Sequence, residues 1–267
     1  MLIDTHAHMQ MIDFADDFSV MIDRCQTEKM AVINIGTSYA DFDKVIELSN
    51  KYDWCYASLG IHPTDVFDNF FDETIFLKYL NDKVVAIGEV GLDLWHLDSI
   101  KTKFALTDKQ ILDKQIEAFV KQIEFARQHD LAVVIHGRNG VEPKFDVYQM
   151  IFNLLQENKN QRVVFHCYGG DYLMAKKIVD VGYFLGFDGP ITFKKNIELR
   201  DMIKKLPITN ILAETDCPFL APEPVRGQRN EPIFVKHIIS KIAEIKNIPV
   251  IETEDILWNN AKNLFKL

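Results

Sequence analysis

Eight short apolar runs, separated by stretches with helical spacing, constrain the fold of this chain more than any other feature. The runs are typical of buried parallel strands, and they cover residues 2–5, 31–35, 56–59, 84–87, 132–135, 162–165, 183–187 and 210–213. Strands that alternate with helices form parallel βαβ units, and eight such units favour closure into a TIM-like (β/α)8 barrel of the α/β class. An open, doubly wound sheet is the alternative fold.

The stretches between the runs carry apolar residues at helical spacing, for example Ile111, Ile116, Phe119 and Ile123. After the eighth run, a proline-rich loop precedes two additional C-terminal helices at about 234–246 and 252–265, the second capped by Thr253. Residues 92–107 are expected to form an unusually long loop. The 267 residues suit one barrel, so we expect a single barrel domain over residues 1–267.

Composition excludes several classes of protein. Lys and Arg number 30 against 39 Asp and Glu, and a net charge of −9 argues against a surface coated for non-specific polyanion binding. The four cysteines form no Cys-x-x-Cys pair, which excludes a zinc ribbon and favours reduced thiols. The chain has neither a basic, apolar leader nor a run of about 20 apolar residues, so we expect a cytoplasmic protein without a membrane partner.

Potential metal ligands cluster near the ends of the predicted strands. His6 and His8 lie one residue apart at the end of the first run, and alternate residues of a strand point the same way. Glu89, His136, His166 and Asp216 lie at or just beyond the ends of four later runs. Each residue taken alone is compatible with a structural role, but strand ends of a barrel converge on one rim. Their joint placement predicts a metal site, with His96, His129 and His237 outside it.

The donor set indicates the kind of metal centre. Four imidazoles and two carboxylates suit Zn, Mn, Fe or Co better than a pure Mg or Ca cage. Six donors exceed the three that an open catalytic ion usually takes, and they suffice for two ions that share a carboxylate. Two divalent ions would leave the site positively charged, so the cleft would attract anions although the protein is acidic.

An ordered set of motifs carries a family resemblance over the whole chain. The motifs are Asp4-Thr5-His6-Ala7-His8, Gly60-Ile61-His62-Pro63, Gly88-Glu89-Val90-Gly91-Leu92-Asp93, Gln115 and Gln122 ahead of Ile135-His136, His166-Cys167-Tyr168, Gly189-Pro190-Ile191-Thr192-Phe193, Glu214-Thr215-Asp216-Cys217-Pro218 and Arg226-Gly227-Gln228-Arg229-Asn230-Glu231-Pro232. With these motifs the chain resembles the TatD family of metal-dependent deoxyribonucleases, within the amidohydrolase superfamily.

The resemblance implies a binuclear metal centre with assigned ligands. His6, His8 and Asp216 would bind the first ion, His136 and His166 the second, and Glu89 would bridge both. The ions would be Zn, Mn or Mg. The implied reaction is phosphodiester hydrolysis by a metal-bridged water, with Asp216 as both ligand and catalytic base.

Three further residues are candidates for substrate binding. His62 is expected to hydrogen-bond the scissile phosphate or assist the leaving oxygen, with a structural cap beside Pro63 as the alternative. Arg138 and Lys194 are candidates for phosphate contacts, with solvated rim charges as the alternative. Arg226 and Arg229 would contact phosphate or brace Asp216. Departures from the family pattern at Leu94, Gly137 and Gln228 leave the six proposed ligands intact but put the details of the substrate in doubt.

The predicted function is therefore an exonuclease-type deoxyribonuclease, a monomer without an obligate protein partner, acting on single-stranded or frayed DNA. One alternative is a superfamily hydrolase of a small ester, amide or phosphoester, which would need the same ion pair. A third alternative is a non-catalytic scaffold with structural metals. Trp95 and Phe104, in the expected 92–107 loop, would either stack bases or shield a smaller substrate.

Overall fold

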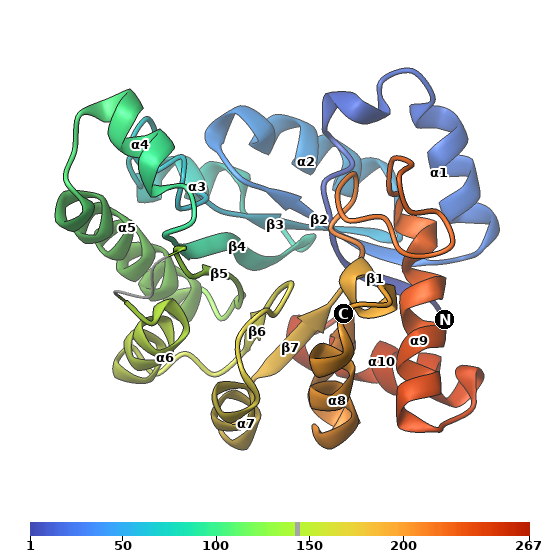
Figure 1. The fold of residues 1–267 in the computed structure, drawn as a ribbon. Helices are drawn as coiled ribbons and strands as arrows, with labels where there is room; N and C mark the ends of the chain where they lie inside the picture. Colours follow the sequence, from blue (N-terminus) through green and yellow to red (C-terminus); the bar gives the residue numbers. More distant parts are fainter. Residues whose placement is uncertain (142–144) are drawn as a thin grey trace.

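The computed structural model describes residues 1–141 and 145–267. Eight strands form one sheet in the order of the sequence, and neighbouring strands pair in parallel (Figure 1). The strands are β1 Ile3–Ala7, β2 Ala31–Gly36, β3 Cys55–Leu59, β4 Val84–Asp93, β5 Ala132–Arg138, β6 Val163–Phe165, β7 Phe184–Phe187 and β8 Ile211–Ala213. All eight predicted strands are present.

The first and last strands meet at a short seam just beyond β8. The backbone N–H of His8 donates to Cys217 O at 2.9 Å, and that of Asp216 donates to His6 O at 2.9 Å. Thr5 adds a side-chain hydrogen bond to Ala213 O at 3.1 Å. These bonds nearly close the sheet into a barrel, so the (β/α)8 prediction is confirmed and the doubly wound alternative is wrong.

The helices surround the strands on the outside (Figure 1). They are α1 Phe18–Thr27, α2 Tyr39–Lys51, α3 Glu73–Tyr79, α4 Leu97–Phe104, α5 Asp108–Gln128, α6 Val147–Glu157, α7 Tyr172–Asp180, α8 Ile197–Lys205, α9 Val235–Lys246 and α10 Val250–Phe265, with 3-10 turns at Ile12–Phe14, Gly189–Thr192, Ile208–Asn210 and Pro232–Phe234. None of the helices in the described ranges is both long and apolar enough to span a bilayer.

Helix α10 covers the amino-terminal end of the barrel. Its residues Leu264 and Phe265 belong to the same apolar cluster as Ile3, Ala31 and Ala132, which start three of the strands. Asn260 in the same helix donates side-chain hydrogen bonds to Ile208 O and Ile211 O, both at 2.8 Å. Because this end is filled, the carboxyl ends of the strands are the free face of the barrel.

Two local predictions are wrong. Residues 92–107 are not one long loop, because β4 continues to Asp93 and helix α4 occupies Leu97–Phe104. Thr253 does not cap the last helix. It is buried inside α10, which begins at Val250 after Pro249, and the Thr253 N–H already donates to Pro249 O at 2.9 Å. A threonine does cap helix α5, where Thr107 and Gln110 form a reciprocal capping box.

Candidate metal centre

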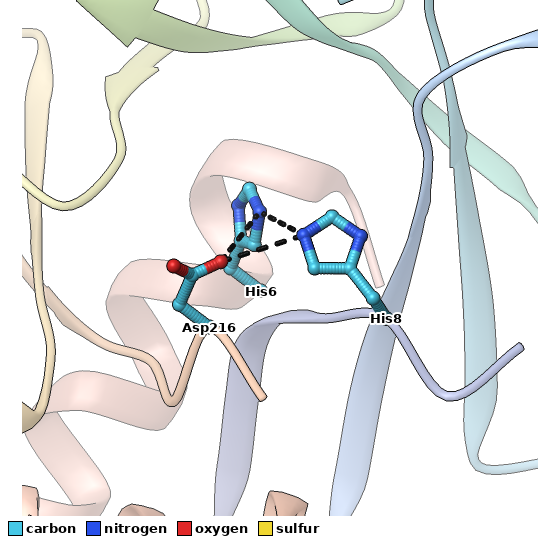
Figure 2. A group of neighbouring side chains, drawn as sticks. All are labelled: His6, His8 and Asp216. Carbon is cyan, nitrogen blue, oxygen red and sulfur yellow. Dashed lines mark hydrogen bonds and ion pairs between the residues drawn. The ribbon is translucent and has the colours of Figure 1, made fainter. Parts of the chain in front are cut away.

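Three donors, two from the end of β1 and one from the segment after β8, meet above the seam between these strands. His8 Nε2 lies 3.2 Å from His6 Nε2, and Asp216 Oδ1 lies 3.6 Å from His6 Nε2 and 3.4 Å from His8 Nε2 (Figure 2). Asp216 has a left-handed backbone conformation with φ of 56°, which aspartate tolerates better than most residues. This group could hold one cation.

Asp4 fixes the backbone beneath this group. Its carboxylate accepts hydrogen bonds from the backbone N–H of His6 at 3.2 Å and of Thr215 at 2.9 Å, and from the Thr215 hydroxyl at 2.5 Å. These bonds connect the end of β1, which carries His6, to Thr215, the residue before Asp216.

Glu89 lies between the first group and a second one, with one oxygen facing each. Its Oε2 is 3.4 Å from His6 Nε2 and 3.9 Å from His8 Nε2. Its Oε1 is 2.6 Å from His136 Nδ1 and 2.9 Å from His166 Nε2. The carboxylate therefore has the placement expected of a bridge between two cations.

The close approach of β4 and β5 brings Glu89 to His136. Gly91 pairs with His136 in the sheet and has φ of 150°, and a Cβ at residue 91 would overlap the carbonyl oxygen of His136. Only glycine therefore fits here without displacing β5. Both Glu89 and His136 lie within their strands, because β4 and β5 extend beyond the predicted apolar runs.

Three of the four imidazoles have a partner on the nitrogen that faces away from Glu89. His8 Nδ1 lies 3.0 Å from Ile35 O, and since a carbonyl only accepts, this nitrogen donates and Nε2 is the nitrogen that would bind a cation. His136 Nε2 lies 3.0 Å from Asp93 Oδ2. His166 Nδ1 lies 3.4 Å from Glu214 Oε1, an ion-pair distance without hydrogen-bond geometry. Such outer partners orient ligating histidines. The buried Nδ1 of His6 has no hydrogen-bond partner among the described residues.

The carboxylates at the centre are held in their charged form. Burial raises the pKa of Glu89, but the positive charge of His166 and hydrogen bonds from the surrounding histidines outweigh it, so the pKa lies well below its ordinary value. Burial also raises the pKa of Asp216, and the hydrogen bond from His8 reverses that effect, leaving the pKa lowered. Both groups are therefore anionic donors at neutral pH.

His62 lies beside the second group, just beyond β3. Its Nε2 is 3.7 Å from Glu89 Oε1, and its ring lies edge-on to the ring of His136 at 4.4 Å. Burial, with the charge of His136, lowers the pKa of His62 to about 3, so the ring is neutral at pH 7. The backbone N–H of Thr64 donates to Nδ1 at 3.2 Å. In the neutral ring, the proton therefore resides on Nε2, which faces the centre.

Five of the six donors line a cavity of about 860 Å³ at the carboxyl ends of the strands, within the size range of small-ligand sites, and His6 lies fully buried behind them. His62 and Arg138 also line it, together with Trp95 and Phe219. Lys194 is exposed and lies outside the described lining, so its contact with substrate stays a prediction. The cavity is therefore lined by potential metal ligands and, at its rim, by aromatic and cationic side chains.

A family model described as TatD related DNase matches residues 3–266 of this chain. The chain belongs to the TatD-related DNase family. An uncharacterized metal-dependent hydrolase, YabD of Bacillus subtilis, is 35% identical over all of both chains. Deoxyribonuclease TATDN3 of Homo sapiens is 30% identical, with 99% of this chain and 94% of that protein covered. The crystal structure of YjjV, a TatD homologue from Escherichia coli, superposes with a TM-score of 0.85 at 28% identity, covering 100% and 98% of the two chains.

Family membership confirms the prediction of a metal-dependent hydrolase with clustered metal-binding residues. The number and identity of the ions do not follow from it. In this TatD-family chain the six proposed ligands lie together around Glu89, and their role as metal ligands stays a prediction.

Sequence reasoning gave no role to three residues around this centre. Asp93 accepts from His136, His96 Nδ1 lies 2.8 Å from the same Asp93 oxygen, and Glu214 lies behind His166. Asp93 and Glu214 were part of the family motifs, and His96 was expected to lie outside the site. The signal that could have found these residues is their spacing from the histidines in the sequence. Spacing alone does not give the contacts, because they depend on the register of the strands and on side-chain rotamers.

The arginines after β8 do not contact Asp216. Arg229 forms a two-bond ion pair with Asp17 at 2.6 and 2.8 Å, and Arg226 lies over the ring of Phe193 at 4.0 Å. Arg229 therefore anchors the proline-rich loop to the start of α1, and it does not brace the proposed base.

Proposed function

We propose that this chain is a deoxyribonuclease that hydrolyses phosphodiester bonds at single-stranded or frayed DNA ends. The observation that carries the proposal is the placement of Glu89, whose two carboxylate oxygens face two separate groups of histidines. A human relative that is 30% identical is named a deoxyribonuclease, which supports DNA as the substrate.

Two divalent ions fit the donor set. His6, His8 and Asp216 offer ligand atoms that all lie within 4.8 Å of one another, and His136 Nδ1 and His166 Nε2 lie 2.6 and 2.9 Å from the same Glu89 oxygen. We assign His6, His8 and Asp216 to one ion, His136 and His166 to the other, and Glu89 to both. Imidazole and carboxylate donors suit Zn or Mn, with Mg as the third candidate.

Bound divalent ions would lower the pKa of a water molecule and offset negative charge on the phosphoryl oxygens. Asp216 is placed to orient that water and accept its proton, because its carboxylate is anionic and lines the cavity. His62 carries its proton on Nε2 and is placed to donate a hydrogen bond to a phosphoryl oxygen or to the leaving oxygen. Arg138 would bind a neighbouring phosphate.

We also propose that residues 1–267 act as one domain and as a monomer in the cytoplasm. The last helix packs against the first strand and β8, and the six donors all come from one chain. All four cysteines are free thiols, as expected in a reducing compartment.

The test is hydrolysis of a labelled single-stranded oligonucleotide by protein that has been stripped of metal and reloaded with Mg, Mn or Zn. Asp216→Asn is expected to abolish turnover while circular dichroism remains that of the wild type. Asp201→Asn, which changes an exposed carboxylate on α8, is the matched control and should keep full activity. If no ion supports DNA turnover but generic esters are cleaved, the small-ester alternative replaces the nuclease.

A further inference from the structure

The rim of the cavity carries two exposed aromatic side chains, one near each half of the metal centre. Trp95 follows β4 two residues after Asp93, and its side chain is half exposed. Phe219 follows β8 three residues after Asp216, has a similar exposure, and its ring lies 6.3 Å from that of His8. Both line the cavity. The lining of the cavity therefore includes one aromatic side chain from beyond β4 and another from beyond β8.

Arg138 lies beside Trp95 at the rim of the cavity. Its guanidinium lies over the indole ring at 4.9 Å from the ring centroid, and the pairing of Asp93 with Arg138 in the sheet fixes the two residues beside each other. A guanidinium covers one face of the ring, and the exposed surface of the indole remains open to a second planar group. Among the described lining residues, Arg138 is the one with a permanent positive charge.

The spacing along β5 relates this pair to the metal centre. Arg138 is two residues beyond His136, which at the rise of a strand corresponds to about 6.6 Å. This is close to the length of one nucleotide in an extended strand. Arg138 is therefore close enough to the centre to bind the phosphate next to the cleaved one.

We propose that the rim binds single-stranded DNA through two unpaired bases, one stacked on Trp95 and one on Phe219, while Arg138 binds the phosphate next to the cleaved bond. The proposal rests on the nuclease function proposed above and assigns its substrate specificity to these residues. Bases in a duplex stack on each other and offer no free face, so the arrangement selects single strands and frayed ends. Aromatic stacking of this kind tolerates any base sequence.

The test compares two substrates of the same enzyme. Trp95→Ala and Phe219→Ala are each expected to lower kcat/KM for a single-stranded oligonucleotide by about 5- to 150-fold, the range for loss of one stacked base. Activity on bis(p-nitrophenyl) phosphate, which has no base, should fall by a much smaller factor than activity on the oligonucleotide. Trp95→Phe should retain most of the oligonucleotide activity. Phe70→Ala, at an exposed phenylalanine outside this cavity, is the matched control.

Binding gives a readout that does not depend on turnover. In an Asp216→Asn background, titration with oligothymidylate should quench the indole fluorescence, and Trp95→Phe should remove most of the quenching. Arg138→Gln should reduce the slope of log affinity against log salt by about 0.7, the value for one phosphate contact on a single strand. Lys176→Gln on α7 should leave the slope unchanged.

The outcomes separate this proposal from the nuclease function. If the wild type hydrolyses DNA and the aromatic variants lose nothing, or lose activity equally on both substrates, the base-binding proposal is overturned and the nuclease function stands. If the wild type cleaves only bis(p-nitrophenyl) phosphate and its fluorescence does not respond to oligothymidylate, both are overturned. Quenching that depends on Trp95 without DNA turnover supports the base-binding site and contradicts the nuclease function.

Discussion

Asp93 and His136 form a buried carboxylate–imidazole pair in which Asp93 Oδ2 lies 3.0 Å from His136 Nε2. Burial raises the pKa of Asp93, but the hydrogen bond and charge of His136 outweigh it, so the carboxyl is ionised at neutral pH and accepts the imidazole proton. His136 Nδ1, which lies 2.6 Å from Glu89 Oε1, is then the nitrogen that would bind a metal ion, releasing the proton it shares with Glu89. Asp93 is therefore a positioning residue for the second proposed ion.

Asp93→Asn should weaken metal binding at this centre by about 10- to 100-fold, the usual effect of losing an outer partner of a ligating histidine. The measurement is competition with a chromophoric chelator. His96→Gln is the control, because His96 contacts the same carboxylate from the exposed side and should leave the affinity close to that of the wild type. Equal effects of the two substitutions would contradict a role that acts through His136.

Thr215→Val should destabilise the fold and disturb the first metal group. The Thr215 hydroxyl donates to Asp4 Oδ2 at 2.5 Å and accepts from the Cys217 N–H at 3.1 Å, and both partners are buried. Leaving buried polar groups unsatisfied costs about 1–3 kcal/mol of unfolding free energy. Urea denaturation measures this loss.

A matched threonine shows whether the effect is specific. The Thr102 hydroxyl also forms a hydrogen bond, to Asp98 O at 2.8 Å, but it is exposed on α4. Thr102→Val is expected to change the unfolding free energy by no more than about 0.5 kcal/mol. Similar losses for the two variants would refute the role assigned to the Asp4–Thr215 bond.

The ion pair between Asp17 and Arg229 should contribute stability that depends on pH. The hydrogen bond from Arg229 holds the pKa of Asp17 below its ordinary value of 3.8. The folded state then binds this proton less readily than the unfolded state, so the contribution is complete above pH 3.8 and is lost as pH falls through the lower, folded pKa. Because the pair is partly exposed, its contribution is about 0.2–1 kcal/mol.

Asp17→Asn should therefore lower the unfolding free energy slightly at pH 7, and the difference from the wild type should shrink as the solution is acidified below pH 3.8. Urea titrations at several pH values test this. A difference that is constant with pH, or that grows in acid, would show that the pair does not act through its charge.

The fold was predictable because closed parallel strands are buried on both faces and leave continuous apolar runs, such as Ala132 to Ile135 in β5. The ends of the strands were less predictable. Glu89 and Asp93 continue β4 with polar side chains, since the ladder to β5 extends into the site, and apolar patterning cannot detect that continuation.

The site was predictable at the level of which side chains meet, because strand ends converge at one rim. Which nitrogen of each histidine faces inward was not predictable, since that depends on partners such as Ile35 O and Asp93. Trp95 and Phe104, which were given the same two possible roles, also differ in the structure. Trp95 lines the cavity, whereas Phe104 packs against Phe67 with ring centroids 5.2 Å apart.

The most direct test of the account is the metal content of the protein, measured by mass spectrometry after metal-free protein is reloaded with Mn or Zn and dialysed, alongside the oligonucleotide assay. The account predicts two divalent ions per chain, with DNA hydrolysis absent in the stripped protein and restored on reloading. Full DNA hydrolysis by protein that contains no divalent ion, or a centre that saturates with one ion at full activity, would contradict it.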